Sequence, residues 1–381
     1  MARPAGPLIP SPRFTSPLHH ERVAARLGLA LGVTFGLCFA TGVISHLIQD
    51  PPSWFEWPAR PAGLYRVTQG LHVAAGIASI PLLLAKLWTV YPKLFAFPPF
   101  ESVAHLLERI SLLPLVAGSV FLLFSGVANI ALWYPWEFFF PRAHFWAAWL
   151  TMGALIVHIG AKASKIRPNI QRPSVSSGPP EADDQSRRRF LWGVAATSGL
   201  ITIATVGQTV RPLAGISVLA PRDPRQGPQG VPVNKSARQA GVIETAVDPS
   251  YRLTIRGNVA NELTFDLDEL RALPLRGARL PISCVEGWSA EADWEGISLP
   301  MLLDLAGAAP GASVRVESLQ QRGLFRTSLI NGRHARDRDT LLALSIDGEP
   351  LHIDHGFPVR LIGPNRPGVH QTKWVHEVVV L

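Results

Sequence analysis

The chain has 381 residues, more than most single domains contain, so we expect two or more folding units. Charged residues make up 17% of the sequence and apolar residues 47%, whereas roughly 25% of a typical soluble protein is charged. This balance excludes a disordered chain, a coiled coil and an ordinary soluble enzyme. The two cysteines, Cys38 and Cys284, are too few for a disulfide scaffold or for a cysteine-bound zinc or iron–sulfur site.

Five segments contain no Asp, Glu, Lys or Arg and are long enough to cross roughly 30 Å of hydrocarbon. They cover residues 27–48, 67–85, 110–133, 143–161 and 190–207. None has the single polar stripe that a buried helix of a soluble protein shows. We therefore predict an α-helical membrane bundle of four spans, residues 22–165, and a fifth span at 190–207.

The positions of basic residues predict the orientation of these spans. Lys and Arg gather before the first span, between spans two and three, and between spans four and five, whereas the opposite loops hold only Arg60, Arg66 and Arg142. This predicts a multi-pass protein of the cell membrane with a cytoplasmic N-terminal segment (1–21) and a cytoplasmic linker (166–189). Much of the net charge of +8 then reflects topology, so we expect no nucleic-acid partner.

Everything after the fifth span is expected on the outer face of the membrane. Residues 208–233 are rich in Pro and Gly and predict a linker. Residues 234–381 predict short strands at 251–256, 313–317, 357–362 and 373–381 and a helix at 299–306. The pattern is typical of an α+β domain large enough to form its own core.

Histidines inside membrane helices are costly and usually have a function. His144 and His158 are 14 residues apart on the fourth span, nearly on one face and about 21 Å apart along the axis. That spacing suits two haems, one near each membrane surface, with imidazole as an axial ligand. We expect His72 on the second span to serve the outer site. Further candidate ligands lie near the span ends: His46 for the outer site, and His20 and His105 for the inner site.

Three features of the first half belong together: the string Gln69-Gly-Leu-His-Val-Ala-Ala-Gly76, the string Phe124-Ser-Gly-Val127, and the His144/His158 pair. With them the region resembles the di-haem cytochrome b subunits of membrane-bound formate dehydrogenases and hydrogenases, which are cytochrome b561-like four-helix bundles. The resemblance implies one or two haem b groups and electron exchange with a membrane quinone.

The string Ser186-Arg-Arg-Arg-Phe-Leu191 lies at the start of the fifth span. It resembles the twin-arginine export signal, which moves folded and often cofactor-loaded domains across the membrane. Basic residues that simply flank a membrane helix are the alternative interpretation. We find no Ala-x-Ala cleavage site after Gly207 and therefore expect the span to remain as an anchor.

Cys284 lies in the string Ile282-Ser-Cys-Val-Glu-Gly-Trp-Ser289. A single cysteine can be an inert buried thiol, a nucleophile or a ligand of a soft or redox-active metal. A cysteine hydrolase would also need a histidine, and five in this region are candidates: His334, His352, His355, His370 and His376. No nucleophile-elbow pattern surrounds Cys284, so the spacing gives the hydrolase little support.

Two further strings follow in order, Trp294-Glu-Gly-Ile-Ser-Leu299 and Gly356-Phe-Pro-Val-Arg-Leu-Ile-Gly-Pro364, the latter leading to Lys373-Trp374. Together with the cysteine string they resemble the molybdopterin domain of the sulfite oxidase family, in particular its bacterial protein-methionine-sulfoxide reductases. The resemblance implies that Cys284 is the catalytic thiolate on molybdenum. It also implies that seven residues contact the pterin and its phosphate: Asn234, Ser318, His355, Arg360, Gln371, Thr372 and Lys373.

The substrate is less defined. Family domains transfer an oxygen atom to or from a small sulfoxide- or sulfite-like substrate. Five arginines are candidates for an anion site, with a solvated face as the alternative: Arg322, Arg326, Arg333, Arg336 and Arg338. The sequence ends soon after the cofactor domain, so we expect a monomeric catalytic domain without the dimerisation domain of full sulfite oxidases.

The sequence thus predicts one polypeptide that passes electrons between membrane quinone, haem b and a molybdenum centre. Two alternatives from other classes stay open. One is a membrane-anchored binding or sensory module whose metal site has decayed. The other is a cysteine hydrolase on a membrane anchor.

Overall fold

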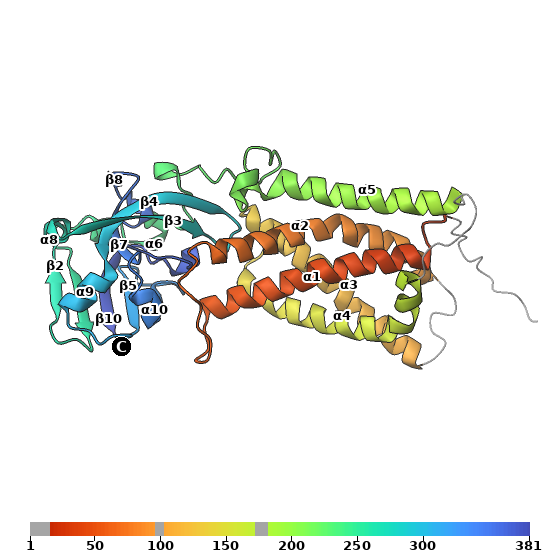
Figure 1. Ribbon diagram of the computed structural model, residues 1–381, viewed down its shortest axis with the longest axis horizontal. Coiled ribbons are helices and arrows are strands. Elements are labelled where there is room, and N and C mark those ends of the chain that lie inside the picture. The colour runs from red at the N-terminus through yellow and green to blue at the C-terminus, as the bar shows by residue number, and fades with distance from the viewer. Residues whose placement is uncertain (1–15, 96–102, 172–181) are drawn as a thin grey trace, which may run out of the picture. The chain divides into compact units, whose positions relative to one another are not determined.

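The computed structural model describes residues 16–95, 103–171 and 182–381 (Figure 1). It divides into two compact units. The helical unit contains the chain up to Ala40 and His72–Thr205, and the C-terminal unit contains Thr41–Leu71 and Val206–Leu381. The sequence-based division assigned residues 41–71 to the membrane domain, whereas in the structure they belong to the C-terminal unit.

Five long helices overlap the five predicted spans: α1 (Glu21–Gln49), α2 (Leu64–Val90), α3 (Val103–Ile130), α4 (Phe140–Gln171) and α5 (Ala182–Thr205). Each is long and apolar enough to cross a membrane, as predicted. α3 ends three residues before the predicted span does, because Leu132 adopts a left-handed backbone conformation with φ 54°. α4 and α5 extend into the predicted 166–189 linker, since a helix need not end where its apolar stretch ends.

The helical unit leaves many large apolar side chains exposed, among them Leu113, Leu150 and Leu200, which are 71%, 62% and 71% exposed. Apolar surface on that scale is expected where a protein faces lipid. Helices approach closely at small residues: a Cβ atom on Gly118 of α3 would lie 3.3 Å from the Cβ of Thr151 on α4. Lipid-facing surface and small-residue contacts agree with a multi-pass membrane protein.

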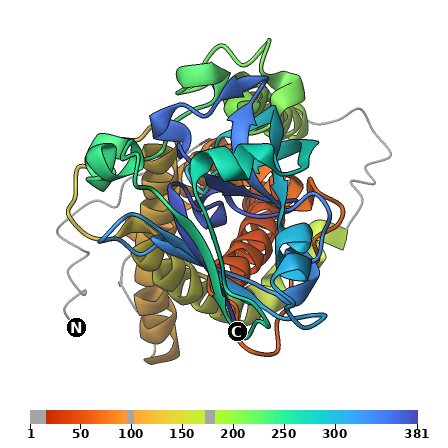
Figure 2. The same cartoon turned by 90° about the vertical axis from the view of Figure 1, so that its left-hand side faces the viewer.

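The C-terminal unit contains two five-stranded sheets, seen from a second direction in Figure 2. The first sheet has the order β2 (Leu263–Phe265), β1 (Leu253–Gly257), β10 (Val375–Val380), β5 (Val314–Ser318) and β6 (Thr327–Ile330). Only the β1–β10 pair in it is parallel. The second sheet has the order β3 (Leu275–Ser283), β4 (Ser289–Ser298), β7 (Leu341–Ile346) and β8 (Glu349–Pro350), and β9 (Arg360–Ile362) also pairs with β7.

Short helices connect the strands: α6 (Ala237–Ala240), α7 (Ile243–Ala246), α8 (Leu267–Ala272), α9 (Leu299–Leu305) and α10 (Gly332–Ala335). α8 begins at a capping box in which Asp266 accepts from two backbone N–H groups and Glu269 accepts from the backbone of Asp266. The predicted α+β class is confirmed. Each of the four predicted strands and the predicted helix overlaps an observed element: β1, β5, β9, β10 and α9.

Alternating side chains give the second sheet two buried faces. Leu342 and Leu344 of β7 join the larger core, which also contains β1, β5, β10 and α9, whereas Leu341 and Ala343 join a second core. A bulge in β4 at Gly296 changes the phase of the alternation, and no side chain fits there because a Cβ would lie 2.2 Å from the Leu342 carbonyl oxygen. The second core contains Cys284, so the fold buries the predicted metal ligand.

Candidate molybdopterin site and helical histidines

Cys284 lies in the tight turn that joins β3 to β4 and is 1% exposed. Its backbone N–H donates to the Trp288 carbonyl oxygen at 2.9 Å, and its carbonyl accepts from the Gly287 N–H at 3.0 Å. Gly287 has φ 76°, a conformation that favours glycine. The Cys-Val-Glu-Gly-Trp string is therefore a hairpin turn that fixes the position of the thiol.

Residues that follow α5 hold this turn from outside. Gln208 Nε2 donates to the Gly287 carbonyl oxygen at 3.1 Å, and the Thr209 hydroxyl donates to the same oxygen. Arg222 donates to the Glu286 carbonyl at 3.2 Å and forms an ion pair with its carboxylate at 3.4 Å. The turn that carries Cys284 thus depends on the 208–222 stretch, which the sequence predicted as a linker.

Three buried cations, Arg360, Arg366 and Lys373, lie in the segment that includes β9 and leads to β10. Arg360 donates to the His355 carbonyl at 3.0 Å and stacks on the ring of Trp294 at 5.2 Å. Lys373 Nζ donates to the Lys235 and Asp354 carbonyls at 2.6 and 2.9 Å.

Arg366 likewise donates only to carbonyl oxygens, those of Leu329 and His370, each at 3.2 Å. Carbonyl oxygens solvate a cation without neutralising it, and buried charges normally have a partner of opposite sign. Within residues 182–381, which the structure describes, no carboxylate lies within ion-pair distance of these three cations.

Burial is the main cause of the pKa shifts in this site. Burial lowers the pKa of Lys373 to about 7, with the positive charge of Arg360 adding to the effect. Burial also lowers the pKa of Arg360 to about 10 and raises the pKa of the Cys284 thiol above its ordinary value. A nucleophilic cysteine needs a lowered pKa, so this thiol is not prepared for a hydrolase reaction. A bound metal would supply the positive charge that a thiolate requires.

The site fits an anionic cofactor that has a phosphate and a soft metal. Arg360 Nε and Gln371 Oε1 are buried without a hydrogen-bond partner in the described structure. One donor and one acceptor are therefore available to bond a bound cofactor. Gly356 has φ 114°, and a Cβ there would lie 3.1 Å from Lys373 and 3.2 Å from the Cβ of Arg360. That close approach lets the loop bring the two predicted phosphate ligands together.

The other predicted pterin ligands lie around these cations, with one exception. Ser318 donates to the Lys373 carbonyl at 2.7 Å, Gln371 donates to the Arg366 carbonyl at 3.1 Å, and the Thr372 and Ser328 hydroxyls are 2.6 Å apart. His355 is buried, and its Nε2 lies 2.7 Å from the Pro228 carbonyl oxygen.

Asn234 is the exception, because it is exposed and only its neighbour Lys235 contacts the cluster. The sequence interpretation missed Arg366. Arg366 lies two residues after the Gly356–Pro364 string, and nothing in the local sequence marks it as a site residue.

The arginine-rich stretch is partly neutralised. Arg333 pairs with Glu56 at 3.3 Å, Arg338 with Asp339 at 3.9 Å, and Arg336 with Asp304. Arg322 and Arg326 are exposed. Three of the five arginines therefore serve ion pairs with the protein's own carboxylates, which favours the solvated-face interpretation for those three.

In the helical unit, His72 of α2 and His144 of α4 face each other with ring centroids 6.2 Å apart. Nδ1 of His72 lies 2.9 Å from the Cys38 carbonyl oxygen, and Nδ1 of His144 lies 3.2 Å from the Ser125 hydroxyl. Such bonds fix the orientation of an imidazole, as they do for metal-binding histidines.

The remaining candidate haem ligands are placed as follows. His46 belongs to the C-terminal unit, unlike His72 and His144. Nδ1 of His20 accepts from the Arg22 N–H at 3.1 Å. His158 lies on α4, and the side chain of His105 falls outside the described residues. Which histidine would bind the inner haem together with His158, His20 or His105, stays a prediction.

Comparison with known proteins gives a match for the C-terminal part. Residues 240–381 match the family model described as "Oxidoreductase molybdopterin binding domain". Over 156 residues the chain is 32% identical to the mitochondrial sulfite oxidase of Drosophila melanogaster, covering 34% of this chain and 27% of that enzyme.

Two reductase subunits are also similar. The chain is 27% identical over 240 residues to the protein-methionine-sulfoxide reductase catalytic subunit MsrP of Burkholderia mallei, covering 52% of this chain and 70% of that protein. It is 34% identical over 131 residues to a putative protein-methionine-sulfoxide reductase subunit, YedZ1, of Azospira oryzae, covering 34% of this chain and 49% of that protein. The chain thus spans about half of the Azospira protein and about a quarter of the Drosophila enzyme.

The part of the chain that matches the molybdopterin-binding oxidoreductase model has two sheets, a buried thiol and three buried cations. Residues 240–381 match the molybdopterin-binding oxidoreductase model, and the chain is similar to a sulfite oxidase and to a methionine-sulfoxide reductase catalytic subunit. This bears out the resemblance predicted from the Cys284 string and the two strings that follow it.

Proposed function

We propose that the chain is a membrane-bound molybdopterin oxidoreductase that passes electrons between membrane quinone, haem b and a molybdenum centre. The reaction is oxygen-atom transfer to or from a sulfoxide- or sulfite-like small molecule. The observation that carries this proposal is that one unit buries the Cys284 thiol and three cations, which within residues 182–381 have no carboxylate at ion-pair distance. A decayed binding module would have no reason to keep such costly groups buried.

In this proposal each residue has a defined task. Cys284 supplies a thiolate to molybdenum, and Arg360, Arg366 and Lys373 bind the anionic part of the pterin. When bound, molybdenum supplies two-electron redox chemistry and a site for the transferred oxygen. The protein contributes rigid positioning of the thiol and exclusion of water, since both the turn and the cations are buried.

We propose haem b for the helical unit, held by His72 and His144. The rings of His72 and His144 would be close enough to hold one haem iron together, and the haem would supply one-electron transfer. The observed separation of 6.2 Å supports this pair over the alternative with His46. The proposal also includes a second haem at His158 and a cytoplasmic N-terminus. It further includes export by the twin-arginine route and a monomeric catalytic domain.

The test is metal analysis and a reduced-minus-oxidised spectrum of the full chain purified in detergent. We expect molybdenum and a b-type α band. We further expect His72→Ala and His144→Ala each to lose haem, while His46→Ala, the matched control, keeps it. A full chain with neither molybdenum nor the band would refute the proposal. Labelling of Cys284 by thiol reagents in the molybdenum-loaded protein would favour the cysteine hydrolase instead.

A further inference from the structure

The segment that leads into α2 and includes its first two residues, 57–65, belongs to the C-terminal unit although it lies some 180 residues before the domain matched by the family model. We call it the helix-connecting segment. Ala62 in it packs against the second core, the one that contains Cys284. Tyr65, at the start of α2, is 1% exposed, and its backbone N–H donates to the Asn365 side chain at 2.6 Å. The segment therefore reaches the surroundings of the predicted metal ligand.

One residue of the cofactor domain, Asn365, directs all its polar groups to this segment. Its backbone N–H donates to the Ala62 carbonyl at 2.9 Å, and its own carbonyl accepts from Trp57 Nε1 at 3.1 Å. Its side-chain Oδ1 accepts from the Tyr65 N–H at 2.6 Å, and its Nδ2 donates to the Pro58 carbonyl at 2.5 Å. Asn365 is 2% exposed and has φ 55°, so this arrangement is buried and conformationally demanding.

The residues directly after Asn365 contact the Cys284 turn. Pro367 forms a parallel bridge with Ser283, the residue before Cys284. A Cβ on Gly368 would lie 3.3 Å from the Ser283 carbonyl oxygen and 3.6 Å from the Cys284 Cα. The turn of residues 365–368 thus has the helix-connecting segment at one end and the metal-ligand turn at the other. It also contains Arg366, one of the three buried cations.

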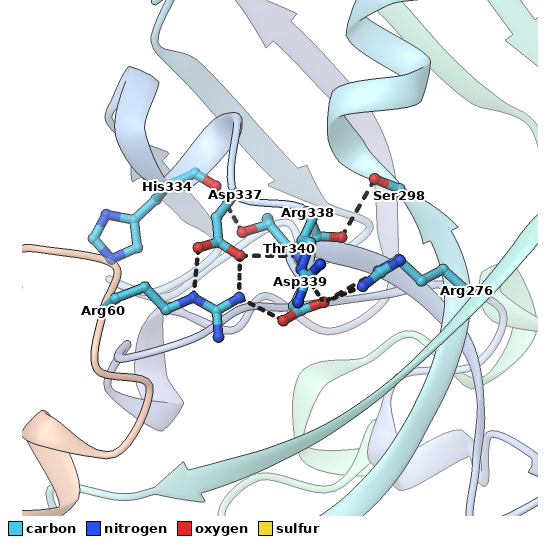
Figure 3. Close-up of polar contacts among 8 residues, drawn as sticks. All are labelled: Arg60, Arg276, Ser298, His334, Asp337, Arg338, Asp339 and Thr340. Atoms are coloured by element: carbon cyan, nitrogen blue, oxygen red, sulfur yellow. Dashed lines mark hydrogen bonds and ion pairs between the residues drawn. The ribbon is translucent and has the colours of Figure 1, made fainter.

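A second contact of the segment is shown in Figure 3. Arg60 donates through Nε and Nη2 to both carboxylate oxygens of Asp337, at 2.9 and 2.8 Å, and also contacts Asp339. Asp339 in turn accepts from Arg276 of β3 at 2.9 and 3.1 Å. These ion pairs attach the segment to the loop that precedes β7, outside the buried site.

We infer that the helix-connecting segment completes the molybdopterin site, because through Asn365 it holds the 365–368 turn against the Cys284 turn. Asn365 and Trp57 are positioning residues in this inference, since neither needs to touch the cofactor. The inference rests on the proposed role of Cys284 as the molybdenum ligand. It adds that the domain matched at 240–381 is incomplete without residues that precede α2.

Two variants of the full chain in detergent test this. Trp57→Phe keeps the aromatic ring but removes the N–H that bonds Asn365. Asn365→Gly removes both side-chain bonds while keeping a residue that tolerates positive φ. Trp54→Phe is the matched control, because Trp54 is 74% exposed and lies three residues before Trp57, just outside the helix-connecting segment.

The first measurement is hydrogen–deuterium exchange of residues 363–371. We expect both variants to exchange about fivefold faster there than wild type, with Trp54→Phe unchanged, because a lost bond lowers the local opening free energy. The second is the Mo(V) electron paramagnetic resonance signal. We expect its line shape to change in both variants while the molybdenum content stays the same. A residue with a purely structural role away from the molybdenum site would leave the line shape unchanged.

Exchange of residues 363–371 that is equal in Trp57→Phe and Trp54→Phe overturns the inference, and so does an unchanged Mo(V) signal in a variant with faster exchange. The exchange measurement does not depend on metal. A chain without molybdenum would therefore refute the proposed function, while exchange would still report whether the segment holds the turn.

Discussion

Buried polar groups are satisfied differently in the two units. In the helical unit His72 and His144 each contact one nearby oxygen, and much of the surrounding apolar surface is exposed for lipid. In the C-terminal unit Arg360, Arg366 and Lys373 are buried among carbonyl oxygens from distant segments. A helical site thus depends on a few side chains at a fixed spacing, whereas the cofactor site depends on how separate chain segments are brought together.

The largest expected effect is at the centre of the C-terminal site. Cys284→Ser replaces a soft thiolate by a weakly acidic hydroxyl of similar size, so the fold and the haem spectrum should not change. Pterin content should stay near normal, because in the proposed site Arg360 and Lys373 would hold the phosphate independently of Cys284. We expect turnover with a viologen donor to fall at least about 100-fold, equivalent to ~2.7 kcal/mol of barrier. Activity above about a tenth of wild type would show that Cys284 is only a structural thiol.

A smaller effect is expected at the edge of the cation cluster. Lys373→Met removes a positive charge but keeps the length of the side chain, so pterin should be retained about tenfold less well, as for a lost charge-assisted bond. Pterin content of the purified chain measures this. Arg252→Met, at an exposed arginine that bonds only carbonyls of residues 249 and 251, is the control and should retain pterin normally. Equal retention in the two variants would exclude Lys373 from the site.

The buried histidines of the C-terminal unit predict a pH dependence of its stability. Burial, with Arg360 and Arg366 nearby, lowers the pKa of His355 to about 4 and that of His334 to about 3. An unfolded histidine binds its proton near pH 6.5, so between pH 6.5 and 4 the unfolded state holds more protons. Stability is therefore full above pH 6.5 and falls as pH decreases, by up to about 1.4 kcal/mol per pH unit for each histidine.

Thermal unfolding of the full chain between pH 4 and 7, followed by tryptophan fluorescence, measures this decline. His355→Gln keeps a donor for the Pro228 carbonyl and should flatten the profile, whereas His376→Gln on β10 should not. A profile that is flat in wild type would mean that these histidines take up protons at the same pH in the folded and unfolded states, which would contradict the lowered pKa values.

The parts of the fold that could be predicted from sequence are those set by local composition. An apolar run of about 20 residues specifies a membrane helix wherever it lies, and all five runs became helices. The α+β class followed from alternating apolar residues and from turn residues. The 166–189 linker was placed less well, because basic and small residues continue α4 and α5 beyond their apolar parts.

The site was predictable only where its residues fall within one string. Cys284, Arg360 and Lys373 lie in such strings, but Asn365 and Arg366 follow the last one and carry no local signal. Nor could the sequence assign residues 57–65 to the C-terminal unit, since the partners of Trp57 and Arg60 are some 280–310 positions away. The choice between His46 and His72 likewise depended on which ring faces His144.

The smallest expected effect distinguishes the two kinds of contact made by the helix-connecting segment, the surface ion pairs of Arg60 and the buried hydrogen bonds to Asn365. Arg60 is 47% exposed in its ion pair with Asp337, and Arg256 is 46% exposed in its pair with Glu377, which joins β1 to β10. Exposed pairs of this kind contribute little to stability and are screened by salt. Arg60→Gln and Arg256→Gln should therefore lower the melting temperature of the full chain by similar, small amounts that vanish at high salt.

The two variants should differ in where exchange increases. Arg60→Gln should speed hydrogen exchange at residues 337–340 but leave 363–371 protected, because the Asn365 bonds are buried and do not need the ion pair. Arg256→Gln should affect neither stretch. If Arg60→Gln instead exposes 363–371 as strongly as Trp57→Phe does, the surface ion pairs and the buried Asn365 network form one cooperative unit, and the segment is held mainly by charge.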